Sequence, residues 1–66
     1  MKVCINGINR EIPNGTTLEG LVDLFKVNGK SVVLELNRQI VDRNIFAKTP
    51  LKEDDTIEIV QFVGGG

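Results

Sequence analysis

The chain has 66 residues, enough for one small domain, and its eight basic and nine acidic residues give a net charge of -1. It contains one cysteine and no histidine, which excludes an intrachain disulfide and removes the commonest metal ligand and general base. The balanced charge and the three aromatic residues, all Phe, argue against nucleic-acid binding.

The same composition bears on location and catalysis. Apolar runs are only a few residues long, far short of the ~20 residues that cross a bilayer. The N-terminus also lacks the apolar stretch of a signal peptide, and a lone cysteine is typical of a reducing compartment. We therefore expect a cytoplasmic protein that binds no membrane, no nucleic acid and no metal, and that is not itself an enzyme.

Residues 2–12 are predicted to form a β-hairpin around Asn6-Gly7, the strongest sequence signal for a two-residue turn. Such a turn sets three cross-strand pairs: Ile5 with Ile8, Val3 with Arg10, and Met1 with Ile12. All six side chains then share one face, and five of them are apolar. We expect the stem of Arg10 to pack on that face and its charged head to reach solvent.

A helix is predicted from Thr17 to Asn28. Thr16, followed three residues later by Glu19, has the pattern of a capping box. A buried stripe at helical spacing is predicted for Leu18, Leu21, Val22 and Phe25. Asn28-Gly29 provides a left-handed stop.

The second half of the chain alternates short strands with turns. Ser31 to Leu36 is β-branched and alternating, with Val32, Leu34 and Leu36 on one side and Val33 and Glu35 on the other. After it we expect a turn at 37–39, a short strand at 40–41, a helical turn within 42–50 anchored by Ile45 and Phe46, and a polar turn at 51–55. The last strand is predicted from Thr56 to Val63, with Ile57 and Ile59 inward and Glu58, Val60 and Phe62 outward.

This order of elements predicts an α+β fold of the ubiquitin-like β-grasp type. One main helix covers one face of a small mixed sheet, and the first and last strands lie parallel at its centre. We expect the domain to span residues 1–63 and a flexible glycine tail to follow at 64–66.

Several segments resemble the ThiS-type sulfur carrier proteins of thiamin biosynthesis, and the resemblance runs the whole length of the chain. The segments are Asn6-Gly7, Thr17-Leu18 with Leu21, residues 36–43, Leu51, residues 55–60 and residues 62–66. The Asn-x-x-Ile-Val-x-Arg stretch and the terminal glycines are the most specific. Asp42 stands where such proteins often have Pro, and Asp54 where Gly commonly precedes Asp, so local loop geometry is open at both positions.

The resemblance implies a chemistry at the Gly66 carboxylate. A ThiF-like adenylating enzyme would use ATP to join AMP to that carboxylate. Sulfur from a cysteine desulfurase would displace AMP and leave a thiocarboxylate, which a ThiG-like thiazole synthase would consume. The carrier itself would bind no cofactor, would act as a protein co-substrate, and is expected to be monomeric when free.

The physical properties of the tail agree with this chemistry. Glycine has no Cβ, so Gly64 and Gly65 make a thin, extended chain that can enter the nucleotide site of another protein. The alternative without a function is a disordered terminus or residues added for expression. Because the tail directly follows the last core strand, we favour the functional interpretation.

An apolar docking patch is predicted beside the tail, made of Val60, Phe62 and Val63. Val60 and Phe62 share the outward face of the last strand, and Cys4 and Val33 are expected nearby. Scattered exposed apolar residues are normal on proteins, but a cluster next to the reactive end favours a partner-binding surface.

Three further features have simpler explanations. Cys4 is interpreted as a half-exposed filler, because no basic residue near it in sequence would activate the thiol. Glu53-Asp54-Asp55 is interpreted as a solvated turn, since adjacent carboxylates point in different directions. Asn37 is expected to stabilise its own turn through an Asx-type hydrogen bond.

Three alternative functions were considered. A MoaD-like carrier would donate sulfur to molybdopterin, and another thiolation pathway is also open. A ubiquitin-like binding module without acyl chemistry would tolerate extension beyond Gly66. An iron–sulfur ferredoxin of the β-grasp type is excluded, because its cluster needs four thiolates.

Overall fold

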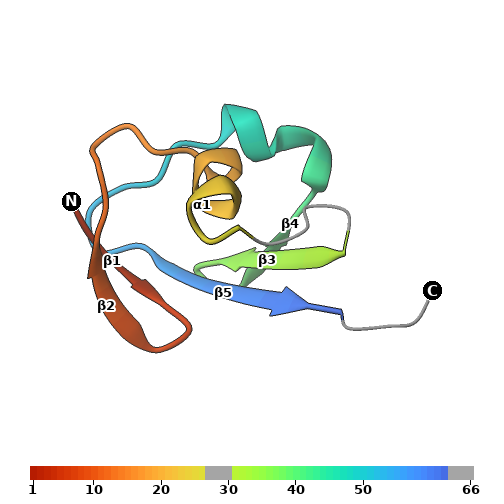
Figure 1. Ribbon diagram of the computed structural model, residues 1–66, viewed down its shortest axis with the longest axis horizontal. Helices are drawn as coiled ribbons and strands as arrows, with labels where there is room; N and C mark the ends of the chain where they lie inside the picture. The colour runs from red at the N-terminus through yellow and green to blue at the C-terminus, as the bar shows by residue number, and fades with distance from the viewer. Residues whose placement is uncertain (27–30, 63–66) are drawn as a thin grey trace.

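The computed structural model describes residues 1–26 and 31–62. The elements in chain order are strands β1 (Lys2–Ile5) and β2 (Ile8–Glu11), helix α1 (Leu18–Leu24), strands β3 (Val32–Leu36) and β4 (Gln39–Val41), the 3-10 helix η1 (Arg43–Lys48) and strand β5 (Thr56–Gln61). The five strands form one sheet in the order β2-β1-β5-β3-β4. Both helices lie over the same face of this sheet (Figure 1).

The sheet confirms the predicted β-grasp arrangement. β1 and β5 lie next to each other and run parallel, while the β1–β2, β3–β4 and β3–β5 pairs are antiparallel. A parallel neighbour requires a crossover, and here α1, β3, β4 and η1 supply it. The last strand therefore lies at the centre of the sheet, between β1 and β3.

The hairpin has the predicted pairing. Val3 lies opposite Arg10 and Ile5 opposite Ile8, and the Ile12 amide donates to the Met1 carbonyl at 2.9 Å. Asn6 and Gly7 have φ angles of 51° and 82°, as a two-residue hairpin turn requires. Ile8 is nevertheless more exposed than its face predicts, because the tip of the hairpin projects beyond the helix (Figure 1).

The predicted helix cap was wrong by one residue. Thr17 is the N-cap, and its hydroxyl oxygen accepts from the Gly20 amide at 3.1 Å. The Thr16 hydroxyl donates instead to the Pro13 carbonyl at 2.7 Å. Glu19 makes no return bond to the cap and forms an exposed ion pair with Arg43 at 3.6 Å.

The predicted end of the helix was also wrong. Helix α1 ends at Leu24, and Lys26 takes the left-handed conformation with φ of 54°. A residue in that conformation directs the chain out of the helix. The expected stop at Asn28-Gly29 lies outside the described residues.

The core forms between α1, η1 and the sheet. Its buried apolar residues are Val3, Ile5, Ile12, Leu18, Leu21, Val22, Val32, Leu34, Phe46, Leu51 and Ile57, and Phe25, Leu36 and Ile59 pack partly buried against them. The inward residues predicted for the helix, β3 and β5 are therefore confirmed. Of the two anchors predicted for the 42–50 segment, Phe46 is buried but Ile45 is exposed.

The remaining boundaries differ by one or two residues. The turn after β3 contains only Asn37 and Arg38, both with positive φ, and Gln39 already belongs to β4. Strand β5 ends at Gln61. Asp42, which stands where the resembling proteins often have Pro, caps η1 by accepting from the Asn44 amide at 2.8 Å.

Candidate functional site

The glycine tail itself, Gly64 to Gly66, and Val63 lie outside the described residues, so their roles stay predictions. What the structure describes is the strand that leads to them. β5 is bonded to β1 on one side and to β3 on the other, and the Phe62 amide continues the ladder by donating to the Ser31 carbonyl at 2.8 Å. The chain is therefore held in the sheet up to Phe62, two residues before the predicted tail begins at Gly64.

Asn6 extends the support of β5 beyond the end of β1. Its Oδ1 accepts from the Ile59 amide at 2.7 Å, and its Nδ2 donates to the Ile59 carbonyl at 3.3 Å. β1 ends at Ile5, so the side-chain amide of Asn6 occupies the place of the next backbone rung. The sequence identified Asn6 only as a turn residue.

Asn37 supports the beginning of the same strand, which corrects the expectation that it would stabilise only its own turn. Its Oδ1 accepts from the Thr56 amide at 3.0 Å, and its Nδ2 donates to Oδ1 of Asp55 at 3.1 Å. The other oxygen of Asp55 accepts from the Lys52 amide at 2.8 Å. Both ends of the Asn37 side chain are thus used to fix the start of β5.

The acidic turn is only partly solvated. Asp55 is buried and bonded as described. Glu53 accepts from the Lys2 amide at 3.1 Å, and Asp54 pairs with Nζ of Lys2 at 3.3 Å. Their partners differ, as expected for adjacent carboxylates, but burial of Asp55 was not expected. Asp54 has φ of 68°, which explains why glycine suits this position.

Val60 and Phe62, the described residues of the predicted patch, lie on the face of the sheet that α1 and η1 do not cover. Val60 is 43% and Phe62 62% exposed. Val60 lies opposite Val33, which is half-buried on the same face. Cys4, also half-buried there, has the uncharged neighbours Asn9 and Thr56 across the strands. The outward direction of Val60 and Phe62 is therefore confirmed, whereas their contact with a partner stays a prediction.

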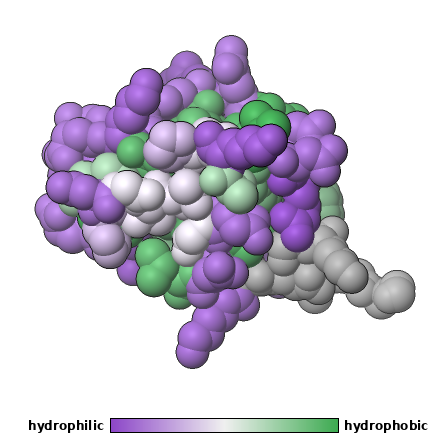
Figure 2. Space-filling view, turned by 90° about the horizontal axis from the view of Figure 1, so that it is seen from above, coloured by the Kyte–Doolittle hydropathy of each residue, from purple (hydrophilic) through white to green (hydrophobic). Residues whose placement is uncertain are grey.

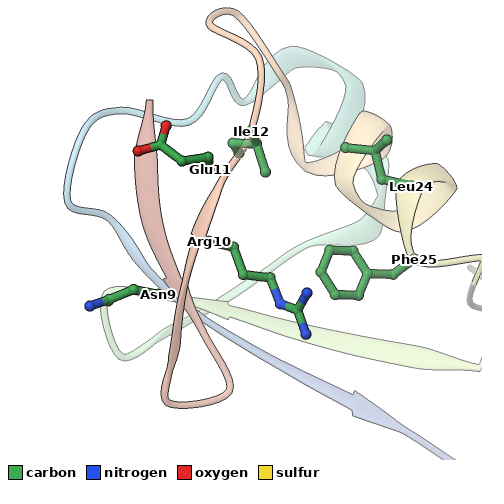
Figure 3. A pocket seen from close by; sticks show the side chains of 6 residues that line it. All are labelled: Asn9, Arg10, Glu11, Ile12, Leu24 and Phe25. Atoms are coloured by element: carbon green, nitrogen blue, oxygen red, sulfur yellow. The ribbon is translucent and has the colours of Figure 1, made fainter.

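The helix side offers an open cleft of about 620 Å³ between β2 and the end of α1. In Figure 3 the side chain of Arg10 points from β2 to the ring of Phe25, with its guanidinium carbon 5.2 Å from the ring centroid. Arg10 is exposed, and its charged head, which was expected to reach solvent, lies over an aromatic ring. The charged groups among the lining residues are the carboxylate of Glu11 and the guanidinium of Arg10.

The rest of that side is mostly hydrophilic on its surface (Figure 2). Seen from above the helices, hydrophilic residues cover much of the surface and the apolar areas between them are small (Figure 2). Within 1–26 and 31–62, no group of three or more His, Cys, Asp or Glu side chains could hold a metal ion. No helix in these ranges is both long and apolar enough to cross a membrane.

Comparison with known proteins adds the family. A family model described as the ThiS family matches residues 3–66. The sulfur carrier protein ThiS of Bacillus subtilis is 36% identical over 50 residues, which are 76% of each chain. The crystal structure of the thiamine biosynthesis protein ThiS from Geobacter metallireducens matches with a TM-score of 0.86 and 29% identity over the whole of both chains.

Two longer relatives also match. Thiazole synthases of Magnetococcus marinus and Paramagnetospirillum magneticum are 41% and 36% identical to this chain over 66 residues. The chain covers 20% of the length of each. A segment similar to the whole chain is thus about a fifth of those proteins.

Proposed function

The chain belongs to the ThiS family, and we propose that it is a sulfur carrier of thiamin biosynthesis that reacts through the carboxylate of Gly66. The observation that carries this proposal is the family match along residues 3–66, which includes the three final glycines. The described strand supports it, because β5 is bonded on both sides and ends at Gln61, three residues before Gly64.

The proposed reaction has two steps. A carboxylate oxygen of Gly66 attacks the α-phosphorus of ATP, pyrophosphate leaves, and an acyl-adenylate forms. Sulfur delivered at the sulfide level then attacks the acyl carbon. The bond between that carbon and the bridging oxygen breaks, AMP leaves with the oxygen and the electron pair, and a thiocarboxylate remains. Because the glycines carry no Cβ, the carbonyl is open to attack from both faces.

The partners follow from this chemistry. A ThiF-like enzyme supplies the nucleotide site. A cysteine desulfurase supplies the sulfur as a persulfide, which a thiol reductant brings to the sulfide level. A ThiG-like thiazole synthase consumes the thiocarboxylate. The two long relatives named thiazole synthase support the last partner, since each includes a segment similar to this chain. The carrier is a co-substrate that performs no catalysis, and we place it in the cytoplasm with these enzymes.

The proposed docking patch comprises Val60, Phe62 and Val63. Ordering a glycine tail in a binding site costs conformational entropy, so a partner must also bind the folded body. We expect Phe62→Asp to leave the fold intact and to weaken binding to the adenylating enzyme, which calorimetric titration measures. The control is Ile45→Asp, the same change at an exposed residue of η1; equal binding by both variants and the parent would refute the patch.

The function is tested with the cognate ThiF-like enzyme. ATP–pyrophosphate exchange that depends on this chain is expected, and the intact mass of protein from its host should show oxygen replaced by sulfur. Deletion of its gene should create a growth requirement that thiazole relieves. A requirement relieved only by molybdopterin-dependent products would favour the MoaD-like alternative, and absence of exchange would favour a binding module.

A further inference from the structure

The side chain of Asn6 lengthens the contact between β1 and β5 in the direction of the tail. β1 pairs with β5 at two positions, the last of which joins Ile5 to Ile57. The Asn6 amide then donates to the Ile57 carbonyl at 2.9 Å. β5 continues past the end of β1 (Figure 1), and there the Asn6 side chain bonds both backbone polar groups of Ile59, at 2.7 and 3.3 Å.

These two bonds are the last that β5 receives on that side. Among residues 1–26 and 31–62, no hydrogen bond from the β1 hairpin reaches β5 beyond Ile59. On the other side, β3 pairs with β5 as far as Gln61, and the Phe62 amide bonds to the Ser31 carbonyl. The part of β5 nearest the tail is therefore bonded on two sides at Ile59 only because of the Asn6 side chain.

Asn37 makes the same kind of contact at the opposite end of β5. Its φ is 50°, compared with 51° for Asn6, and its Oδ1 accepts from the Thr56 amide at 3.0 Å. Both asparagines lie in two-residue turns between strands, and glycine would adopt either conformation without strain. The chain thus has two similar side-chain contacts to one strand, and only the contact from Asn6 lies toward the tail.

We propose that Asn6 is a positioning residue for the reaction of the tail. By holding Ile59, its side chain fixes the place and direction in which the chain leaves the sheet toward Gly66. Without it, the end of β5 is bonded on one side only, and more of its backbone must be ordered when an enzyme takes up the tail. Preorganisation of this kind strengthens binding by reducing the entropy that binding costs. This inference rests on the proposed function, and it assigns to that function a residue outside the tail.

The test compares Asn6→Gly with its matched control Asn37→Gly. Exchange of ATP and pyrophosphate by the ThiF-like enzyme is measured against the concentration of carrier, with ATP saturating and the folded fraction of each variant determined at the assay temperature. We expect Asn6→Gly to raise the KM for the carrier about fivefold or more, as for the ordering of one further residue. Its kcat should stay parental, because the ordering is lost equally from the bound ground state and the transition state. Asn37→Gly should keep the parental KM, although it also loses side-chain bonds to β5.

Amide hydrogen exchange locates the effect within β5. Asn6→Gly should accelerate exchange at the Ile59 amide and not at the Thr56 amide, and Asn37→Gly should do the reverse, because each opening is local. Asn6→Asp keeps the acceptor for the Ile59 amide, so its KM should lie between those of the parent and Asn6→Gly. It replaces the glycine variant in the comparison if Asn6→Gly is unfolded at the assay temperature.

Several results would overturn the proposal. Equal rises in KM for Asn6→Gly and Asn37→Gly would show that only the stability of the fold matters. A parental KM for Asn6→Gly, or for Asn6→Asp in its place, or a parental exchange rate at the Ile59 amide of Asn6→Gly would show that the side chain does not position the tail.

The parent chain separates this proposal from the function on which it rests. If the parent supports ATP–pyrophosphate exchange and Asn6→Gly has the parental KM, only the positioning role is refuted. If the parent supports no exchange with the enzyme, the proposed function is refuted and the positioning role with it.

Discussion

Asn6 has two roles: it forms the hairpin turn, and its side chain supports β5. Only the first can be predicted from the sequence. Its φ of 51° makes it a turn former, and both polar atoms of its side chain bond to the backbone of Ile59. The first role is readable from Asn6-Gly7 alone. The second depends on a strand 53 residues away in the chain, and no local pattern indicates it.

Asn6→Gly tests the second role by itself. Glycine adopts the same positive φ without strain, so the turn is kept while both hydrogen bonds to Ile59 are lost. We expect the free energy of unfolding to fall by about 1–2 kcal/mol, measured by urea denaturation. Asn6→Asp keeps the acceptor for the Ile59 amide, so its free energy of unfolding should lie between those of the parent and Asn6→Gly. A loss below about 0.3 kcal/mol for Asn6→Gly would contradict this role.

The contact between Asn37 and Asp55 could not be predicted from the sequence either. The sequence placed each in a turn, which is correct, but it could not show that the two side chains bond to each other across 18 residues. The outward direction of Val60 and Phe62 was predictable, since alternation along a strand fixes it. In this candidate site, the sequence thus predicts on which face of the sheet a side chain lies. It does not predict which distant residue that side chain bonds to.

At the scale of the elements, order and topology were predictable and helix ends were not. Turn residues and periodicity gave the hairpin, helix and strands. The cap involved a choice between Thr16 and Thr17, which tertiary contacts decide. The Leu18 amide donates to the Thr49 carbonyl at 3.0 Å, and the Leu51 amide donates to the Thr16 carbonyl at 2.8 Å. These two bonds flank a bridge between Thr17 and Pro50, and Thr17 has the extended conformation of an N-cap residue.

If Thr17 is the N-cap, a variant that loses its hydroxyl should be less stable than one that keeps it. Thr17→Ala leaves the Gly20 amide without its acceptor and should reduce the free energy of unfolding by about 1 kcal/mol. Thr17→Ser keeps the hydroxyl and should lose only a small part of that. Thermal or urea unfolding of the two variants measures the difference, and equal stability of both would mean that the cap contributes nothing.

At the scale of the whole molecule, stability depends on a thin core. Leu21 is fully buried between helix and sheet, whereas Leu24, one turn later on α1, is 54% exposed. Leu21→Ala should therefore cost about 2–5 kcal/mol, a large share of the stability of so small a domain. Leu24→Ala is the matched control and should change stability by about 0.5 kcal/mol or less. Ile59 is only half-buried, so Ile59→Ala should lower the free energy of unfolding by less than Leu21→Ala. Similar urea midpoints for Leu21→Ala and Leu24→Ala would show that Leu21 is not packed in the core.

Substitutions in the tail should have the opposite effect to those in the core: they should leave the stability of the fold unchanged and abolish the reaction. One residue added after Gly66 moves the terminal carboxylate out of register, and Gly65→Val adds a branched side chain where a partner's channel should be narrow. Both changes lie beyond the core, so stability should stay within about 0.5 kcal/mol of the parent.

Adenylation should nevertheless collapse in both tail variants, because displacing reacting atoms by about 1 Å can cost on the order of 10²-fold in rate. ATP–pyrophosphate exchange with the ThiF-like enzyme measures this. Cys4→Ala serves as the control that should retain exchange, since Cys4 lies half-buried within β1. Its retained activity would show that the carbonyl chemistry needs no thiol from this chain. Parental exchange rates in the extended and Gly65→Val variants would instead mean that Gly66 is not the reactive end, and a binding module would then be the better account of this fold.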